Sequence, residues 1–386
     1  MVSSPEPRID WNALRDQMPV ARRWAYFDHA AVAPLSLPAQ TAINAWTTDS
    51  AENGDTNWLT WSARVAECRE SAARLLAADA DEVALVPNTT AGINLVAEGL
   101  DWRPGDNVVL SADEFPSNQY PWLNVASRGV AARRVEPGEG GIVSIDRLLA
   151  ACDQRTRVVA VSWVGYAHGW RHNVYELVAR VHERGALVFL DAIQGLGMFP
   201  LDVQQAPVDF LAADGHKWLL GPEGAGVFYV RREHLDRLRP IGVGWNSVVQ
   251  GSDYGRIEPE WKPSAARYEG GTYNVPGFVG LGASLDLLQG FGPTAIGMRL
   301  LQVTADARER LRRIGAEVVG PDEDAHRSGI VAFEMPDEPC LVVRRRCLAR
   351  GVVLSCRAGR IRISPHAYTS TDDLDRLIEA IGSSEH

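Results

Sequence analysis

Six short apolar runs recur along the first two-thirds of the chain, at residues 83–86, 107–110, 157–162, 187–190, 209–212 and 227–230. Their apolar residues are continuous and do not alternate with polar ones, which is typical of parallel strands buried on both faces by helices. Between two of these runs, Val174, Leu177, Val178 and Val181 have helical spacing, and Gly185 follows as a stop signal. The pattern predicts alternating strands and helices over residues 60–235.

The pattern changes after this region. Residues 240–276 are rich in Gly, Pro, Trp and Ser and are predicted to form an irregular connection. Two helical stretches follow between residues 277 and 311. The remaining chain predicts strands at 329–334, 352–355 and 360–364 and helices at 340–349 and 371–381. This order indicates a smaller α+β domain.

Composition narrows the class of protein. The chain has 386 residues, a length typical of about two to three domains, and a formal net charge of −10 without a long run of one sign. A basic nucleic-acid footprint is therefore excluded. The N-terminus shows no apolar signal region and no apolar stretch is long enough to span a membrane. Five scattered cysteines without CxxC spacing favour a reduced, cytoplasmic protein that holds no metal.

Candidate chemistry lies where predicted strands end. Asp191 directly follows the strand at 187–190, and Lys217 follows the strand at 209–213 after a short turn. The turn at 87–92 precedes a predicted helix, whose free N–H groups suit a phosphate. Alone, Asp191 could be a helix cap and Lys217 a solvated side chain. Together, a phosphate cup, a lysine and a carboxylate at the carboxyl ends of strands fit pyridoxal phosphate (PLP).

Several segments then resemble one family: 26–31, 88–94, 114–118, 187–194, 208–224, 268–274 and 360–366. Together they are similar to the class V aminotransferases, fold type I PLP-dependent enzymes that include cysteine desulfurases, kynureninases and isopenicillin N epimerase-like proteins. The resemblance implies an α/β fold in which a mainly parallel seven-stranded sheet lies between helices. It also implies a large PLP-binding domain at 16–275, and a small α+β domain formed by 1–15 and 276–386.

The resemblance also implies roles for individual residues around the cofactor. Lys217 would form the Schiff base and act as the general base, Asp191 would hold the pyridine nitrogen, and Gln194 would hydrogen-bond the ring hydroxyl. The remaining cofactor-binding residues would be Asn88, Thr89, Thr90, Asp214 and His216. Phe115 would stack on the ring, although it could be a core aromatic. Thr272 would reach the phosphate of a partner subunit, which implies a homodimer with shared active sites; alternatively, it is a turn residue.

The substrate side is less defined. An amino-acid carboxylate is usually bound by the planar fork of an arginine, and Arg357 matches the family position better than Arg362. His29 either lines the entrance or caps a turn. Trp163 replaces the Asn or His that relatives commonly carry, and predicts an apolar or aromatic wall unless it belongs to the core.

Cysteine desulfurases carry a nucleophilic cysteine on a mobile loop shortly after the carboxylate arginine. Here no cysteine follows Cys356, which precedes Arg357 and is interpreted as a packed residue. We therefore expect an amino-acid enzyme of the transaminase type, acting through a Schiff base between PLP and its substrate. The alternatives are a PLP-dependent C–S or other β-lyase that lacks the desulfurase cysteine, and an inactive PLP-binding protein.

Overall fold

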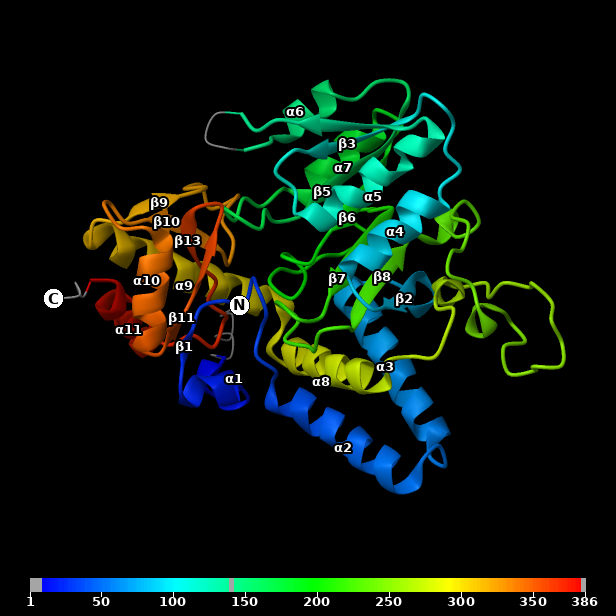
Figure 1. Cartoon of the computed structure of the whole chain (residues 1–386), viewed down its shortest axis with the longest axis horizontal. Helices are drawn as coiled ribbons and strands as arrows, with labels where there is room; N and C mark the ends of the chain where they lie inside the picture. Colours follow the sequence, from blue (N-terminus) through cyan, green and yellow to red (C-terminus); the bar gives the residue numbers. More distant parts are fainter. Residues whose placement is uncertain (1–8, 139–141, 383–386) are drawn as a thin grey trace, which may run out of the picture.

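The computed structural model describes residues 9–138 and 142–382. It has a large part built on a seven-stranded sheet and a smaller part that contains the end of the chain (Figure 1). The large sheet has the order β2-β8-β7-β6-β5-β3-β4. Its strands are β2 (Val83–Val86), β3 (Asn107–Ser111), β4 (Ala131–Val135), β5 (Thr156–Ser162), β6 (Leu187–Asp191), β7 (Phe210–Asp214) and β8 (Gly226–Val230). Strand β8 runs antiparallel to both of its neighbours, β2 and β7, and all other neighbouring strands of this sheet pair in parallel. The sheet is therefore mainly parallel, as the sequence predicts.

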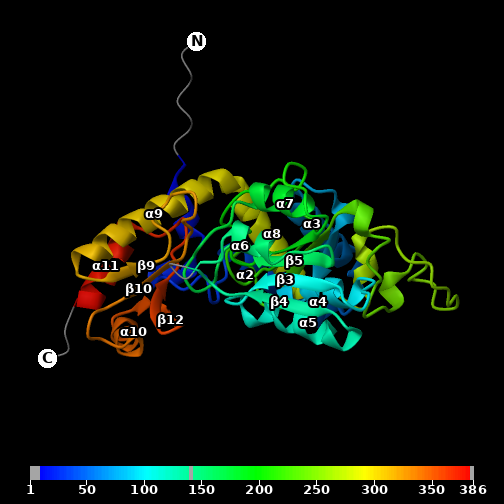
Figure 2. The same ribbon diagram turned by 90° about the horizontal axis from the view of Figure 1, so that it is seen from above.

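Helices cover both faces of this sheet, which explains the continuous apolar runs. In β5, Val158 and Ala160 pack into one buried cluster, whereas Val159 and Val161 pack into another on the opposite face. The first face is covered by α4 (Thr89–Gly99) and α5 (Tyr120–Asn124), and the second by α3 (Trp58–Leu76), α6 (Ile145–Ala150), α7 (Val174–His182) and α8 (Val275–Phe291) (Figure 2). α2 (Leu37–Asn53) packs along α8.

The smaller part is an antiparallel sheet with helices packed against it. The sheet order is β12-β13-β10-β9. Its strands are β9 (Glu317–Val319), β10 (Val331–Glu334), β12 (Ser355–Arg357) and β13 (Arg360–Ile363). Its helices are α9 (Pro293–Arg313), α10 (Cys340–Ala349) and α11 (Thr371–Gly382), and their apolar residues share one buried cluster with the sheet. These strands and helices form an α+β unit of the kind that the sequence predicts for the last part of the chain.

The N-terminal segment is attached to the end of the chain. After α1 (Trp11–Asp16), strand β1 (Ala25–Tyr26) pairs in parallel with β11 (Val352–Val353). The N–H of Ala30 also donates to the hydroxyl of Ser364, at 2.9 Å. These contacts fix residues 28–33 beside the carboxyl ends of β6 and β7, where the candidate site lies.

No helix within the described ranges is long and apolar enough to cross a membrane. Between residue 240 and the start of α8 at Val275, the chain forms two short 3-10 turns, at Trp245–Ser247 and Ala265–Tyr268, and one isolated bridge between Val248 and Trp261, in agreement with the predicted irregular connection.

Candidate active site

A cavity of about 390 Å³ lies at the carboxyl ends of the parallel strands and between the two parts of the chain. It is lined by ten residues that the sequence singled out: Asn88, Thr89, Thr90, Phe115, Asp191, Gln194, Asp214, His216, Lys217 and Arg357. Arg362, the second candidate for a substrate carboxylate, lines it as well. The structure thus gathers residues from five segments into one pocket.

One wall of the cavity is the N-terminus of α4. Asn88 caps this helix, and its side-chain oxygen accepts a hydrogen bond from the N–H of Ala91 at 2.9 Å. Gly92 lets the helix approach the sheet, because a Cβ at this position would lie 2.6 Å from that of Ala212. The N–H groups at the start of α4 have no partner within the helix, so this wall suits a phosphate.

The two threonines of this wall are already hydrogen-bonded through their hydroxyls. The Thr89 hydroxyl accepts from the N–H of Asp214 at 2.9 Å and so ties α4 to the turn before Lys217. The Thr90 hydroxyl donates to that of Ser117 at 2.9 Å. Ser117 also lines the cavity but was given no role from the sequence.

Lys217 and Asp191 are the central charged pair. Both are buried, at 8% and 2% exposed, and no described residue hydrogen-bonds to the Lys217 amine. Burial lowers the pKa of Lys217 to about 8, although the charge of Asp191 opposes this shift. Burial raises the pKa of Asp191 to about 6, against a hydrogen bond from the N–H of Ile193 and the charge of Lys217. A fraction of the lysine is therefore an uncharged nucleophile near neutral pH.

The orientation of Gln194 is fixed by two neighbours. Its amide NH₂ donates to the carbonyl of Ala30 at 2.9 Å, and its amide oxygen accepts from the indole N–H of Trp218 at 2.7 Å. One N–H of the amide remains for another acceptor. Gln194 can thus present a fixed N–H donor to a ligand in the cavity.

An aromatic pair forms another wall. Phe115 is 41% exposed, and its ring meets Tyr166 edge to face with 5.3 Å between the ring centres. The Lys217 amine lies 5.6 Å from the centre of the Phe115 ring. Phe115 is thus free to stack on a planar ligand bound at the lysine.

The two arginines differ in how many of their donors are in use. Arg362 is buried and donates to the carbonyl of Tyr166 at 2.7 Å, to Asp28 at 3.3 Å and to the hydroxyl of Ser355 at 3.3 Å. The hydrogen bond from Arg357 is made to the carbonyl of Cys356 at 2.8 Å. Arg357 therefore keeps more free donors, whereas Arg362 supplies a fixed positive charge.

Three predicted residues lie outside this cavity. Trp163 is packed in the core against Gly195, where a Cβ on the glycine would come within 2.3 Å of the indole. His29 is fully buried and is held by the carbonyl of Ser364 and the hydroxyl of Tyr368, at 2.8 and 2.7 Å. Burial lowers the pKa of His29 to about 4, so it is neutral. Packing against residues that are distant in sequence removes both side chains from the cavity.

Thr272, the third residue, lines a second cavity of about 530 Å³. This cavity lies beside α4 and the segment 268–274. Within one chain, Thr272 therefore faces a different space from Lys217.

Sequence reasoning assigned no site role to the cavity residues 30–32, Ser117 and Ile193. Only their positions in the sequence could have indicated that these residues line the cavity. Residues 30–31 and Ser117 lie in segments that carry the family resemblance, and Ile193 lies between Asp191 and Gln194.

A two-residue turn follows Arg357. β12 ends at Arg357, β13 begins at Arg360, and these two residues are directly paired. Ala358 and Gly359 have φ angles of 48° and 79°, the left-handed conformations that a tight hairpin requires. No loop extends from this position, so the chain provides nothing here that could carry a cysteine into the cavity.

The residues present fit PLP. Asp214 Oδ1 is a buried polar atom without a hydrogen bond from the described residues, and His216 Nδ1 has the other Asp214 oxygen, at 3.0 Å, as its neighbour; both residues lie beside the free N–H groups of α4. The Lys217 amine and the Asp191 carboxylate complete a set that matches the aldehyde, ring nitrogen and phosphate of this cofactor. Lys217 would hold its carbonyl carbon, Asp191 its ring nitrogen, and the α4 N-terminus its phosphate.

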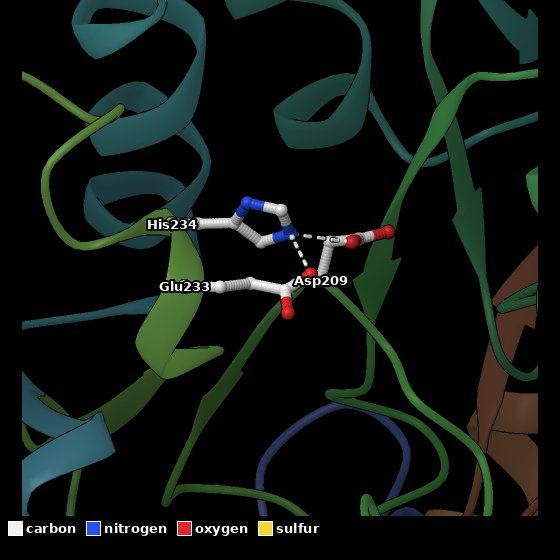
Figure 3. Close-up of side chains that lie close together, drawn as sticks. All are labelled: Asp209, Glu233 and His234. Atoms are coloured by element: carbon white, nitrogen blue, oxygen red, sulfur yellow. Dashed lines mark hydrogen bonds and ion pairs between the residues drawn. The ribbon is translucent and has the colours of Figure 1, made fainter.

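A second cluster of acidic and histidine side chains lies away from the cavity (Figure 3). Asp209, Glu233 and His234 are close enough for a metal ion. However, both oxygens of Asp209 already accept hydrogen bonds, from His234 at 2.6 Å and from His182 at 2.8 Å. The second oxygen also accepts from the N–H of Val188 at 2.7 Å. These bonds explain the cluster as a structural network.

Comparison with known proteins agrees with this geometry. The family model "Aminotransferase class-V" matches residues 25–377. A probable cysteine desulfurase of Methanothermobacter thermautotrophicus is 31% identical over 390 residues, covering 95% of this chain and 96% of the relative. The structure of the cysteine desulfurase CsdA from Escherichia coli is similar with a TM-score of 0.87 and 25% identity, covering 97% of this chain and 98% of that one.

Two structures of C-DES, a cystine C–S lyase, have the same fold. Their TM-scores are 0.89 and 0.87 at 24% identity, they cover 95% of this chain, and this chain covers 98% and 99% of theirs. In one of them, glycine is covalently linked to the PLP cofactor. On the match over residues 25–377 and the full-length relatives, this chain belongs to the class V aminotransferase family and is a PLP-dependent enzyme of fold type I.

Proposed function

We propose that this enzyme is a PLP-dependent C–S β-lyase that acts on cysteine or a related sulfur amino acid without a persulfide-forming cysteine. The observation that carries the proposal is the two-residue turn Ala358–Gly359 after Arg357, which leaves no loop for a nucleophilic cysteine. The relative from Methanothermobacter thermautotrophicus is a probable cysteine desulfurase and CsdA is a cysteine desulfurase, so cleavage of a C–S bond is better supported than the transamination favoured by the sequence alone.

The balanced reaction with cysteine and water gives pyruvate, ammonia and hydrogen sulfide. With a disulfide amino acid such as cystine, the leaving group is a persulfide in place of sulfide. Bound PLP withdraws electrons from the substrate and makes its α-proton acidic. The enzyme then has to remove that proton and let the sulfur leave from the β-carbon.

The chain's own residues supply the other steps. Arg357, with its free donors, binds the substrate carboxylate, and the fixed charge of Arg362 supports it. Lys217, whose pKa is about 8, takes the α-proton as general base once the substrate amine has replaced it. With the cofactor bound, Asp191 would hold the ring nitrogen in its protonated form, and the free N–H of Gln194 would donate to the ring hydroxyl. Phe115, which lines the same cavity, would stack on the ring.

The products separate the candidate reactions. The holoenzyme is incubated with cysteine, cystine or alanine, with and without a keto acid, and pyruvate, ammonia, alanine and sulfide are measured. We expect pyruvate and ammonia in equal amounts from a sulfur amino acid, independent of the keto acid. Alanine formed together with protein-bound sulfur would indicate a desulfurase, and an amino group passed to the keto acid without sulfur release would indicate a transaminase.

Lys217→Ala provides the control for this assay. We expect it to lose the visible absorbance of lysine-bound cofactor and to lower the rate of pyruvate formation at least about 10²-fold. A holoenzyme that turns over none of these amino acids would instead support the inactive PLP-binding alternative.

We also propose that the active enzyme is a homodimer in which Thr272 reaches the phosphate bound by the partner subunit. Its position in a cavity separate from Lys217 supports a role outside its own active site. Sedimentation of the holoprotein, with cofactor retention in Thr272→Ala, tests this. A monomer that retains cofactor, or unchanged retention in the variant, would contradict the assignment.

A further inference from the structure

Two of the five cysteines lie against each other beneath the substrate side of the cavity. Cys340 is the first residue of α10, and Cys356 is the middle residue of β12. Helix α10 packs directly against β12, and Cys340 lies close enough to Cys356 to be one of the groups that raise its pKa. Both side chains are partly exposed and free.

The fold explains why these thiols meet. Cys356 is paired with Ile361 across the sheet, and paired residues point to the same face. Ile361 belongs to the buried cluster beneath α10, and Cys340 packs against that cluster from the helix side. Helix α10 contacts β12 directly. The packing of α10 on the sheet therefore brings Cys340 and Cys356 together.

The pair is also placed next to the candidate substrate arginine. Arg357 directly follows Cys356 and donates to the Cys356 carbonyl at 2.8 Å. Ser355 and Arg357 flank Cys356 on the strand, so their side chains point to the opposite face, toward the cavity. A change at the Cys356 backbone is thus passed to the side chain that we propose binds substrate.

We propose that Cys340 and Cys356 are a reversible disulfide site, closed by thiol–disulfide exchange with a low-molecular-weight disulfide. Cys340 attacks one sulfur of the disulfide, forms a mixed disulfide and releases the first thiol. The Cys356 sulfur then attacks the Cys340 sulfur, loses its proton and releases the second thiol. The pair loses two electrons and the small disulfide gains them, so the reaction is balanced.

The chemistry of the two positions favours this order. Burial, together with Cys340, raises the pKa of Cys356 to about 12, so this thiol stays protonated until its neighbour has reacted. Cys340 is partly exposed at the start of α10, so a small disulfide can reach its sulfur first.

The other cysteines provide internal controls. Cys68 and Cys347 are buried, and burial raises their pKa to about 12 and about 11, so we expect little reaction at either. Cys152 is partly exposed, donates to the carbonyl of Leu148 at 3.3 Å and is separate from the other cysteines in the fold, so it should take up a single adduct. It therefore reports whether the reagent has worked.

The test uses the holoenzyme treated with oxidised glutathione, alkylated and digested for mass spectrometry. We expect a linked pair of peptides containing Cys340 and Cys356, removed by dithiothreitol, and a glutathione adduct on Cys152. In Cys340→Ser the linked pair should disappear and Cys356 should remain unlinked. If Cys152 is modified while the peptides of Cys340 and Cys356 stay unlinked, the proposal is wrong.

The effect on catalysis is a second readout, and it rests on the proposed function. In the oxidised enzyme we expect the KM for the amino acid to rise at least about threefold, because Arg357 is displaced, and Cys340→Ser to abolish that rise. If the two peptides are linked but the KM is unchanged, the disulfide forms as proposed, and the proposed effect of the disulfide on Arg357 is wrong. The mass measurement does not depend on the reaction catalysed, so the two proposals can fail separately.

Discussion

Asp191 and Asp209 are both buried to the same extent, at 2% exposed, yet their surroundings are opposite. Asp209 accepts hydrogen bonds from His182, His234 and the N–H of Val188. Burial alone would raise its pKa, but these bonds outweigh it and hold the pKa below its usual value. Asp191 accepts one bond from the N–H of Ile193, and burial raises its pKa to about 6.

The contrast separates a structural carboxylate from a functional one. Asp209 lies just before β7 and joins the neighbouring strand β6 to the two histidines, so its interactions are complete in the folded chain. Asp191 lies at the opposite end of β6, facing the cavity, and lacks enough partners. A buried charge with too few partners costs stability, and a ligand can recover that cost.

The largest difference should appear when each aspartate is replaced by asparagine. We expect Asp191→Asn to lower activity roughly 10²-fold or more, because the ring nitrogen loses its anionic partner, with no loss of apoprotein stability. We expect Asp209→Asn to lower the free energy of unfolding by about 2–4 kcal/mol, because the contacts with the buried His234 and the partly exposed His182 are weakened, while the folded fraction keeps its activity. Steady-state rates and urea unfolding measure the two effects. A loss of stability in Asp191→Asn together with a loss of activity in folded Asp209→Asn would contradict the comparison.

The pH dependence of apoprotein stability should distinguish the same two groups. Folding raises the pKa of Asp191 from about 4 to about 6, so the folded state holds the proton longer than the unfolded state. Stability should therefore fall as the pH rises from about 4 to about 6, by about 3 kcal/mol, and the difference between the parent and Asp191→Asn should stay constant above that range.

For Asp209 the sign is reversed. Its folded pKa is lowered, so its contribution is present above about pH 4 and is lost as the pH falls below that value. Urea unfolding of the apoprotein and both asparagine variants across this range measures the difference. If the free energies of unfolding of the parent and of Asp191→Asn change with pH in the same way, folding does not raise the pKa of Asp191.

The smallest expected effect concerns Trp218, which orients Gln194 through its indole N–H. Trp218→Phe keeps most of the packing but removes this bond, which we expect to weaken cofactor retention about fivefold. Trp102→Phe is the matched control, because Trp102 is also buried and donates to the carbonyl of Ala97 at 2.7 Å, and it does not line the cavity. Equal cofactor loss in both variants would make the Trp218 effect a general packing effect.

Much of the fold could be predicted from the sequence because buried parallel strands leave continuous apolar runs. The edge strand β4 (Ala131–Val135) was missed because its partly exposed sequence contains two arginines. The short strands β1 and β9 were missed because two or three residues give no periodic signal. Their pairing depends on contacts with distant parts of the chain.

The location of a site residue could be predicted from the sequence where the residue directly follows a strand of the parallel sheet. Asp191 and Lys217 follow strands of the same sheet, so their meeting required only a parallel arrangement. The location of Trp163 could not be predicted in this way. Its side chain turns into the core because Gly195 leaves room for it, and that detail depends on packing between segments.

The pairing of β1 with β11 has a consequence for the order of folding. Residues 30–32 form one wall of the cavity, and their segment is held by the β1–β11 pairing and by the hydrogen bond from Ala30 to Ser364. Arg357 and Arg362 line the cavity from the same distant part of the chain. The cofactor site is therefore complete only after residues 334 positions apart in the sequence have come together, so PLP binding reports on the formation of these long-range contacts.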